Sequence, residues 1–335
     1  AIRRQRQMCI RDSDATYQFG IDYLRDVWYS TSYLLDRKQS MNGCAKKRFE
    51  NYKQQPLEFV FDKSFTGKLS QFGLDPNRRT PSGIKAAIIR EKGTNGEREM
   101  AYMLYLAGFD VKDVTMTDLI SGRETLEDIN MVVYCGGFSN SDVLGSAKGW
   151  AGSFLFNPKA KAALDNFYAR EDTLSLGVCN GCQLMMELGL ITPEDKKKGK
   201  MLHNDSHKFE SNFLGVTVPM NRSVMFGSLS GSKLGIWVAH GEGKFSLPYP
   251  EDHYNVVLKY SYDEYPGNPN GSDYSVAGIA SQDGRHLAMM PHLERACFPW
   301  ENAYYPLDRK EEDQITPWME AFVNARKWVE ANRKK

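Results

Sequence analysis

The feature that most constrains this chain is a cysteine between two glycines, where a buried strand gives way to a helix. Leu174, Leu176 and Val178 form a short apolar run that predicts a central strand of a parallel sheet, and apolar residues recur with near-helical spacing over 184–190. Between them lies Gly-x-Cys-x-Gly, whose glycines allow a turn too sharp for residues with side chains. The sequence therefore predicts a strand–turn–helix unit that lifts Cys179 clear of the sheet.

Cys179 is the candidate nucleophile. Unpaired backbone N–H groups at the start of the following helix favour a thiolate, which is the reactive form of cysteine. The alternative is a buried structural cysteine after a strand, and the motif alone leaves both interpretations open. Cys182 lies inside the predicted helix without a flanking pair of glycines, so we interpret it as a small core residue.

Alternating strands and helices surround this unit and predict an α/β fold. We expect strands at 84–89, 110–115, 130–134 and 173–178, and helices at 97–107 and 160–170. Such β-α-β units imply a mainly parallel sheet flanked by helices, whose ligands bind beyond the carboxyl ends of the strands. The second half is richer in strands, expected at 214–219, 235–239, 254–260, 274–279 and 286–290.

The chain before residue 81 is patterned more weakly. Residues 1–13 carry four arginines and no usable periodicity, which indicates a disordered or extraneous tail. A helix over 17–35 and a short strand over 57–61 are the elements expected in 14–80. They are too few for an independent domain, so we interpret 14–80 as a connector or a remnant of something larger, and 81–335 as the main domain.

Composition excludes several classes of function. Lys and Arg number 43 and Asp and Glu 42, so the chain gives no signal for nucleic acid or an anionic membrane. No apolar run approaches the ~20 residues of a spanning helix, and no secretory signal is evident, so we expect a cytoplasmic protein without a membrane partner. Six scattered cysteines fit neither a disulfide framework nor paired zinc ligands.

A nucleophilic cysteine needs a base, and His292 has the best context. The apolar strand at 286–290 is followed by His292, and Glu294 comes two residues later. Residues two apart in an extended segment face the same side, so Glu294 can hold the imidazole while its other nitrogen meets the thiol. The alternative is a strand-end histidine paired incidentally with a surface glutamate.

An acyl-transfer site also needs donors for an oxyanion. Two backbone N–H groups are candidates, one from Asn180 and one from Gly137 in a glycine-rich turn at the end of a neighbouring strand. Glycines at strand ends also have purely structural explanations. The turn at 240–243, which begins with His240 and Gly241, either lines the same cleft or is only a tight turn.

The sequence predicts no metal and no nucleotide site in this chain. His203 and His207 have i,i+4 spacing, but Asn and Asp lie between them and no third ligand is evident. The turn at 93–96 lacks the Gly-Lys-Ser/Thr of a phosphate loop. We therefore expect no cofactor here.

Several motifs together resemble a known family. They are GVCNGCQ at 177–183, CGGFSNSDVLGSAKGWA at 135–151, REKGTNGEREMA at 90–101, AHGEGKF at 239–245 and MPHLER at 290–295. They are similar to the class I glutamine amidotransferase domain of the formylglycinamide ribonucleotide amidotransferases, or phosphoribosylformylglycinamidine synthases. TPWMEAFVNARKW resembles the closing helix of the large single-chain form, and LRDVWYSTSYLL at 24–35 resembles the segment before this domain.

This resemblance implies roles for individual residues. It implies a flavodoxin-like fold with Cys179 as nucleophile, His292 as base and Glu294 as orienting acid, which agrees with the reading from the residues alone. Gln183 and the glycines of 135–137, Gly136 and Gly137 among them, would line the glutamine pocket. The family more often has proline where Leu293 stands and Tyr-Gly at 140–141, which affects local loop shape.

The implied reaction is hydrolysis of glutamine to glutamate and ammonia. In the family, a synthetase part uses the ammonia with ATP and Mg²⁺ to convert formylglycinamide ribonucleotide to the amidine in purine biosynthesis, so glutamine and that synthetase part are the expected partners. One rival is a same-fold cysteine hydrolase, or an amidotransferase of another pathway. The other is a catalytically silent module that docks to a synthetase.

Overall fold

A single mixed sheet organises the main domain. The computed structural model describes residues 7–12, 15–55 and 57–333. Within them the largest sheet has nine strands in the order β4-β3-β5-β6-β13-β12-β11-β8-β9. The strands are β3 Lys85–Arg90, β4 Asp110–Thr115, β5 Met131–Tyr134, β6 Leu174–Val178, β8 Glu210–Thr217, β9 Lys233–His240, β11 Asn255–Tyr260, β12 Val276–Ala280 and β13 His286–Met289.

The sheet changes character at β13. Strands β4, β3, β5, β6 and β13 pair in parallel. From β13 through β12, β11 and β8 to β9 all pairs are antiparallel. The predicted α/β sheet with additional antiparallel strands in the second half is therefore confirmed. Because β13 lies beside β6, the residues that follow these two strands emerge at the same edge of the sheet.

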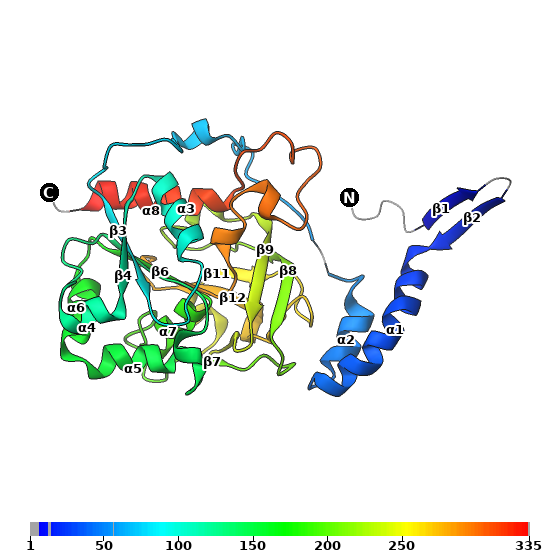
Figure 1. Cartoon of the computed structure of the whole chain (residues 1–335), viewed down its shortest axis with the longest axis horizontal. Helices are drawn as coiled ribbons and strands as arrows, with labels where there is room; N and C mark the ends of the chain where they lie inside the picture. The colour runs from blue at the N-terminus through cyan, green and yellow to red at the C-terminus, as the bar shows by residue number, and fades with distance from the viewer. Residues whose placement is uncertain (1–6, 13–14, 56, 334–335) are drawn as a thin grey trace.

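Helices cover both faces of the parallel half. They are α3 Glu97–Ala107, α4 Met116–Ser121, α5 Lys148–Phe156, α6 Pro158–Ala169, α7 Asn180–Glu187 and α8 Trp318–Asn332. Helix α3 packs against α8, whereas α5 packs against α6 and α7 on the other side (Figure 1). The predicted helix over 97–107 is observed with the same bounds. Sequence analysis missed α4, a single short helix, and α5, whose KGWAGSFLF has no polar face to give a periodic signal.

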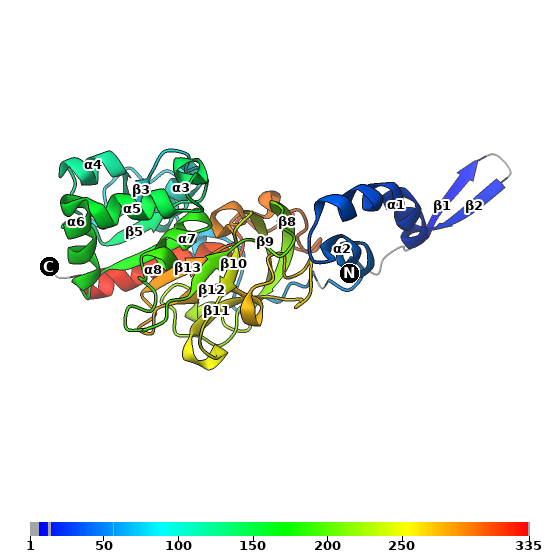
Figure 2. The same ribbon diagram turned by 90° about the horizontal axis from the view of Figure 1, so that it is seen from below.

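The segment before the domain forms a separate helix pair. Helix α1 Ile21–Gln39 packs against α2 Cys44–Asn51, and a two-stranded sheet of β1 Gln7–Asp12 and β2 Ala15–Gly20 continues beyond α1. Figure 2 shows these elements extending from the end of the domain that carries β8 and β9. The helix pair is held by aromatic contacts, including stacked rings of Tyr33 and Phe49 with centroids 4.9 Å apart.

Two expectations for the elements of this region were wrong. The predicted helix over 17–35 begins only at 21, because 15–20 pair as β2. The predicted strand over 57–61 is reduced to one bridge between Val60 and Lys233, although its apolar sequence is typical of a strand. Residues 7–12 form β1, whereas 1–6 and 13 lie outside the described residues. That 1–13 are a disordered or extraneous tail, and that 14–80 connect to something larger, stay predictions.

Helix α8 closes the domain over the sheet. Trp318 at its start is buried and donates its indole N–H to the carbonyl of Gly235 in β9 at 2.9 Å. The short strands β7 Lys200–Leu202 and β10 Lys244–Ser246 pair outside the main sheet. Among the described residues, no helix combines the length and apolar character needed to cross a membrane.

The glycines around Cys179 let α7 approach two strands closely. A Cβ atom added at Gly181 would lie 2.0 Å from the carbonyl oxygen of Tyr134 in β5, and one at Gly177 would lie 2.5 Å from the carbonyl oxygen of Gly181. Both contacts are with backbone, which cannot swing aside. The start of α7 therefore depends on the absence of side chains at these two positions.

We predict that Gly181→Ala destabilises the protein by about 1–3 kcal/mol, because the added methyl must push α7 away from β5. Gly152→Ala in α5 is the matched control: its Cβ meets only Phe156 at 3.8 Å, and alanine is favoured in helices by about 0.5–1 kcal/mol. Urea unfolding of both variants measures the difference. Equal stability of the two variants would contradict the packing argument.

Candidate active site

Cys179 occupies a strained turn between β6 and α7. Its φ of 54° and ψ of −107° are rare for a residue with a side chain. The turn is fixed on both sides, since the Cys179 amide donates to the carbonyl of Met289 in β13 at 2.9 Å and the Gln183 amide donates to the Cys179 carbonyl at 3.0 Å. The sharp turn predicted from Gly-x-Cys-x-Gly is what the backbone adopts.

His292 and Glu294 follow β13 and form a buried pair. Nδ1 of His292 lies 2.6 Å from Oε1 of Glu294, and both side chains are almost fully buried. The backbone N–H of His292 donates to the carbonyl of Trp237 in β9 at 2.9 Å, which fixes the start of this segment. The contact with Glu294 leaves Nε2 of His292 as the ring nitrogen available to another group.

The pair is ionised at neutral pH. Burial alone would lower the pKa of His292, but the charge of Glu294 and hydrogen bonds with Cys179 and Glu294 raise it to about 9. Burial would raise the pKa of Glu294, but the charge and hydrogen bond of His292 hold it below its ordinary value. A protonated imidazole thus stands beside the sulfur of Cys179.

Gly136 and Gly137 have different surroundings. A Cβ at Gly136 would lie 2.8 Å from Cε1 of His292 and 3.3 Å from Cβ of Cys179, so Gly136 makes room for these two side chains. Gly137 has a φ of 120° and pairs with Thr94 through the neighbouring Gly136 carbonyl and Phe138 amide. That pairing does not use the Gly137 amide, and Gly137 lines the cavity.

A cavity of about 220 Å³ opens beside Cys179. Its lining residues come from the β5–α5 loop, the β6–α7 turn, the segment before β8 and the end of β9. They are Gly137, Phe138, Asp142, Ser146, Cys179, Gln183, His203, His207, Lys208, Phe209, Ala239, His240, Gly241 and Glu242. The thiol of Cys179 also lies 3.5 Å from the carbonyl oxygen of Ala239. The cavity therefore lies beyond the carboxyl end of β6, where sequence analysis expected a ligand.

Gln183 and Asn180 connect the walls of this cavity. The Asn180 side chain accepts from the amide of Ser139 at 3.1 Å and donates to Gln183 Oε1 at 2.9 Å. Gln183 then donates through Nε2 to the carbonyl of Glu242 at 2.7 Å. Of the two, Gln183 lines the cavity, whereas Asn180 is not among its lining residues.

His240 presents a neutral imidazole to the cavity. Burial and the neighbouring charge of His292 lower its pKa to about 3. Nδ1 of His240 lies 3.2 Å from Oδ1 of Asn204, whereas Nε2 is buried and has no hydrogen-bond partner among the described residues. The 240–243 turn thus lines the cleft, one of the two alternatives left open by its sequence.

Sequence analysis missed Asp142 and the segment 203–209 at the cavity. Asp142 adds a carboxyl group to that of Glu242 in the 240–243 turn; burial, reinforced by the charge of Glu242, raises the pKa of Asp142, whose Oδ1 has no partner among the described residues. The segment 203–209 forms the opposite wall, and Phe209 packs on Phe138 with ring centroids 5.9 Å apart. Long-range packing brings Asp142 and this segment to the cavity, so no local signal could identify them.

Cys182 behaves differently from Cys179. It is fully buried in α7, and burial raises the pKa of its thiol well above the ordinary value.

His203 and His207 stack with centroids 5.7 Å apart at the edge of the cavity. Within the described part of the chain, no cluster of three or more His, Cys, Asp or Glu residues has the arrangement of a metal site.

Comparisons with known proteins identify relatives across the chain. A family model described as a CobB/CobQ-like glutamine amidotransferase domain matches residues 83–329. The probable phosphoribosylformylglycinamidine synthase, chloroplastic/mitochondrial, of Arabidopsis thaliana is 40% identical over 92% of this chain and 23% of its own length. The phosphoribosylformylglycinamidine synthase of Homo sapiens is 40% identical over 91% of this chain and 24% of its own length.

A solved structure also resembles the chain. The structure of PurLQS from Thermotoga maritima is 27% identical, covers 73% of this chain and 99% of that chain, and has a TM-score of 0.55. The resemblance inferred from the motifs is confirmed by these findings. The chain spans about a quarter of the length of the curated relatives it matches.

We predict that Glu294→Gln lowers the pKa of His292 from about 9, because burial remains while the opposing charge of Glu294 is lost. NMR titration of the histidine ring signals measures this change. His286, whose pKa burial lowers to about 4, is the internal control and should be unaffected.

The same pair makes stability depend on pH. Because the folded pKa of His292 is raised, its contribution to the free energy of unfolding is complete below the ordinary pKa of ~6.5 and is lost as pH rises through about 9. If the pKa of His292 is the same in Glu294→Gln as in the wild type, the Glu294 carboxylate is not the cause of the raised pKa.

Proposed function

Because the chain belongs to the CobB/CobQ-like glutamine amidotransferase domain family, we propose that it hydrolyses the side-chain amide of glutamine to glutamate and ammonia. The observation that carries this proposal is the position of Cys179, which lines a small cavity from a strained turn and adjoins the buried His292–Glu294 pair. A thiol, a base with an orienting carboxylate and a cavity are the parts that covalent acyl transfer requires.

The proposed reaction begins with attack of the Cys179 sulfur on the amide carbon of glutamine. The sulfur attacks as a thiolate whose proton is already on His292, and the backbone N–H groups of Gly137 and Asn180 stabilise the oxyanion of the tetrahedral intermediate. Protonated His292 donates to the departing nitrogen, which leaves as ammonia and yields a thioester. His292 then takes a proton from water, which attacks the thioester, releases glutamate and restores the thiol.

Charges around the cavity support an amino-acid substrate. Asp142 and Glu242 offer carboxyl groups to the α-ammonium of glutamine, and Nε2 of His240 offers an unused polar contact. At about 220 Å³ the cavity is smaller than typical sites for drug-sized ligands, which favours a free amino acid over a peptide. This supports glutamine hydrolysis over the rival of a peptide hydrolase.

The relatives suggest the larger reaction. By analogy with their names, we propose that the ammonia serves ATP-dependent, Mg²⁺-assisted synthesis of formylglycinamidine ribonucleotide in purine biosynthesis. ATP and Mg²⁺ would bind in a synthetase part that corresponds to the three quarters of those proteins outside the match. We also retain a cytoplasmic location and the absence of nucleic-acid and membrane partners as predictions.

Helix α1 offers a surface for that synthetase part. Trp28 is 83% exposed and Leu35 61% exposed, while Leu24, one helical turn before Trp28, is partly covered. Tyr23 and Val27 extend the exposed apolar surface. Such surfaces mark interaction sites, and the length of the relatives outside the match points to the synthetase part as the partner.

We predict that Cys179→Ala lowers glutaminase turnover by about a thousandfold or more, because it removes the covalent route entirely. Cys182→Ala is the matched control and should stay within about threefold of the wild-type rate, since it removes only a buried sulfur. Glutamate release measures both. Equal losses in the two variants would refute Cys179 as the nucleophile.

Adding a separately expressed synthetase part should raise the glutaminase rate and make it depend on ATP and formylglycinamide ribonucleotide. Trp28→Glu should raise the concentration of the synthetase part required for this stimulation by about tenfold or more, because it places a charge at the centre of the apolar patch. Phe156→Glu, on α5 and 87% exposed, is the control. If both variants respond like the wild type, α1 is not the docking surface.

A further inference from the structure

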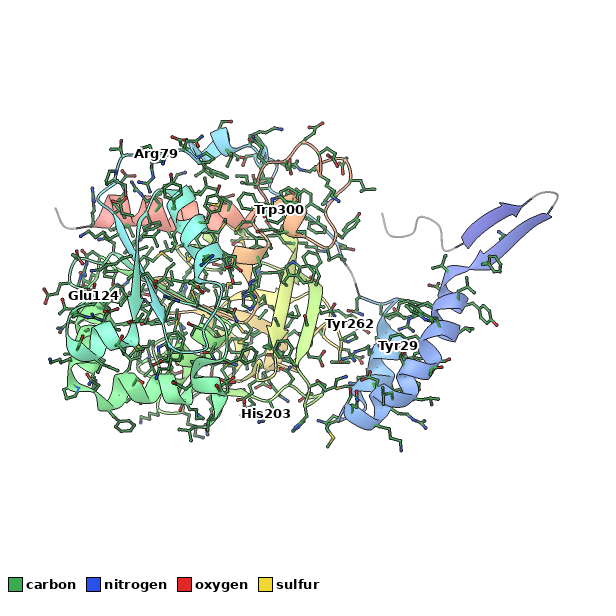
Figure 3. All side chains as sticks on the ribbon, viewed as in Figure 1. Tyr29, Arg79, Glu124, His203, Tyr262 and Trp300 are labelled. Carbon is green, nitrogen blue, oxygen red and sulfur yellow. The ribbon has the colours of Figure 1, made fainter. Side chains whose placement is uncertain are left out.

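The helix pair of α1 and α2 contacts one wall of the active-site cavity. The amide of Met41 donates to the carbonyl of Ser206 at 3.0 Å, and the side chain of Asn42 donates to the carbonyl of Asp205 at 2.8 Å. Both acceptors lie in the 203–209 segment, of which His203, His207, Lys208 and Phe209 line the cavity. Figure 3 marks His203 in this segment and Tyr29 in the helix pair.

Asp36 is the charged centre of this contact. It is the one residue of α1 that is classed as buried, and it accepts from Nζ of Lys208 at 2.8 Å and from Arg48 at 3.0 Å. Burial opposes its charge, but its hydrogen bonds and these two cations hold the pKa of Asp36 below its ordinary value. The Lys208 side chain lines the cavity while its ammonium is bound by a residue outside the domain.

Arg48 extends the network into β8. It bridges Asp36 to Glu210, with N–O distances of 3.0 and 3.1 Å, and both carboxylates are buried. Glu210 also accepts from the hydroxyl groups of Ser206 at 2.5 Å and of Tyr265 at 3.0 Å. Removing one member of such a network leaves buried charges uncompensated, so its geometry is strongly determined.

The inner side of the 203–209 segment is held by hydrogen bonds of Asn204 rather than by ion pairs. Asn204 is buried and donates to the carbonyls of His240 and Lys208, at 2.7 and 2.9 Å. His207, between these anchors, has a φ of 53° and is exposed. Asn204 therefore holds one end of the wall from inside the domain. At the other end, the side chain of Lys208 is held by Asp36 from outside the domain.

We propose that Asp36, through Lys208 and Arg48, positions the 203–209 wall, so that a helix pair outside the amidotransferase domain sets how tightly the cavity binds glutamine. This inference rests on the proposed function, since the ligand is taken to be glutamine. Asp36 is a positioning residue that does not line the cavity. Its loss should therefore weaken binding of the substrate more than it slows the chemistry at Cys179.

The test uses a glutamine-derived diazoketone, which binds as glutamine does and alkylates the nucleophilic thiol. For Asp36→Asn in the full chain, the concentration giving half-maximal inactivation should rise on the order of tenfold, while the limiting rate of Cys179 alkylation stays within about twofold. Asp36→Glu keeps the carboxylate and should recover most of the affinity. Glu50→Gln removes an exposed pair with Lys46 on α2 and is the control.

Hydrogen exchange provides a readout that does not depend on the ligand. Backbone amides in 203–209 should exchange faster in Asp36→Asn than in Glu50→Gln, because the wall has lost its outer anchor.

Unchanged exchange and unchanged half-maximal concentration in Asp36→Asn would overturn the inference while leaving the proposed function intact. A fall in the limiting rate of Cys179 alkylation as large as the rise in the half-maximal concentration would also overturn it, since it would indicate a general disturbance of the site. A wild-type chain whose Cys179 is not alkylated in a saturable manner would instead refute the proposed function, and this inference with it.

Discussion

The close approach of α7 to β5 and β6 is the constraint on which the site depends. Gly177 and Gly181 allow backbone atoms to contact backbone atoms there, and Cys179 adopts a strained conformation with a φ of 54°. The turn places the thiol at the edge where β13 also ends, so the next chain segment can supply His292 and Glu294. Sheet order thus brings together residues more than a hundred positions apart in the sequence.

Buried charge gives the site its chemical character. An ionised His292–Glu294 pair in a nearly water-free position is stable only because each member compensates the other. His240 lies close enough for the charge of His292 to help keep it neutral. One histidine is therefore suited to proton transfer, and the other to a neutral hydrogen bond with a ligand.

The sequence predicted those parts whose signals are local. Periodicity located the strands of the main sheet and α3, and Gly-x-Cys-x-Gly located the turn, because each reflects sterics within a few residues. LEFVF at 57–61 misled because an apolar run becomes a strand only where a neighbouring strand can pair with it along its length. Asp142 and Lys208 at the cavity, and the ion network of Asp36 behind its wall, were missed because only long-range packing assembles them.

The central claim is that Cys179 forms a covalent bond with the acyl group of glutamine. The direct measurement is to quench the chain with acid during turnover of isotope-labelled glutamine and to map the label by peptide mass spectrometry. The account predicts a glutamyl thioester on Cys179 that disappears as glutamate is released. Label on Cys182 or another residue, or steady glutamate release with no bound label and an intact Cys179→Ala activity, would contradict it.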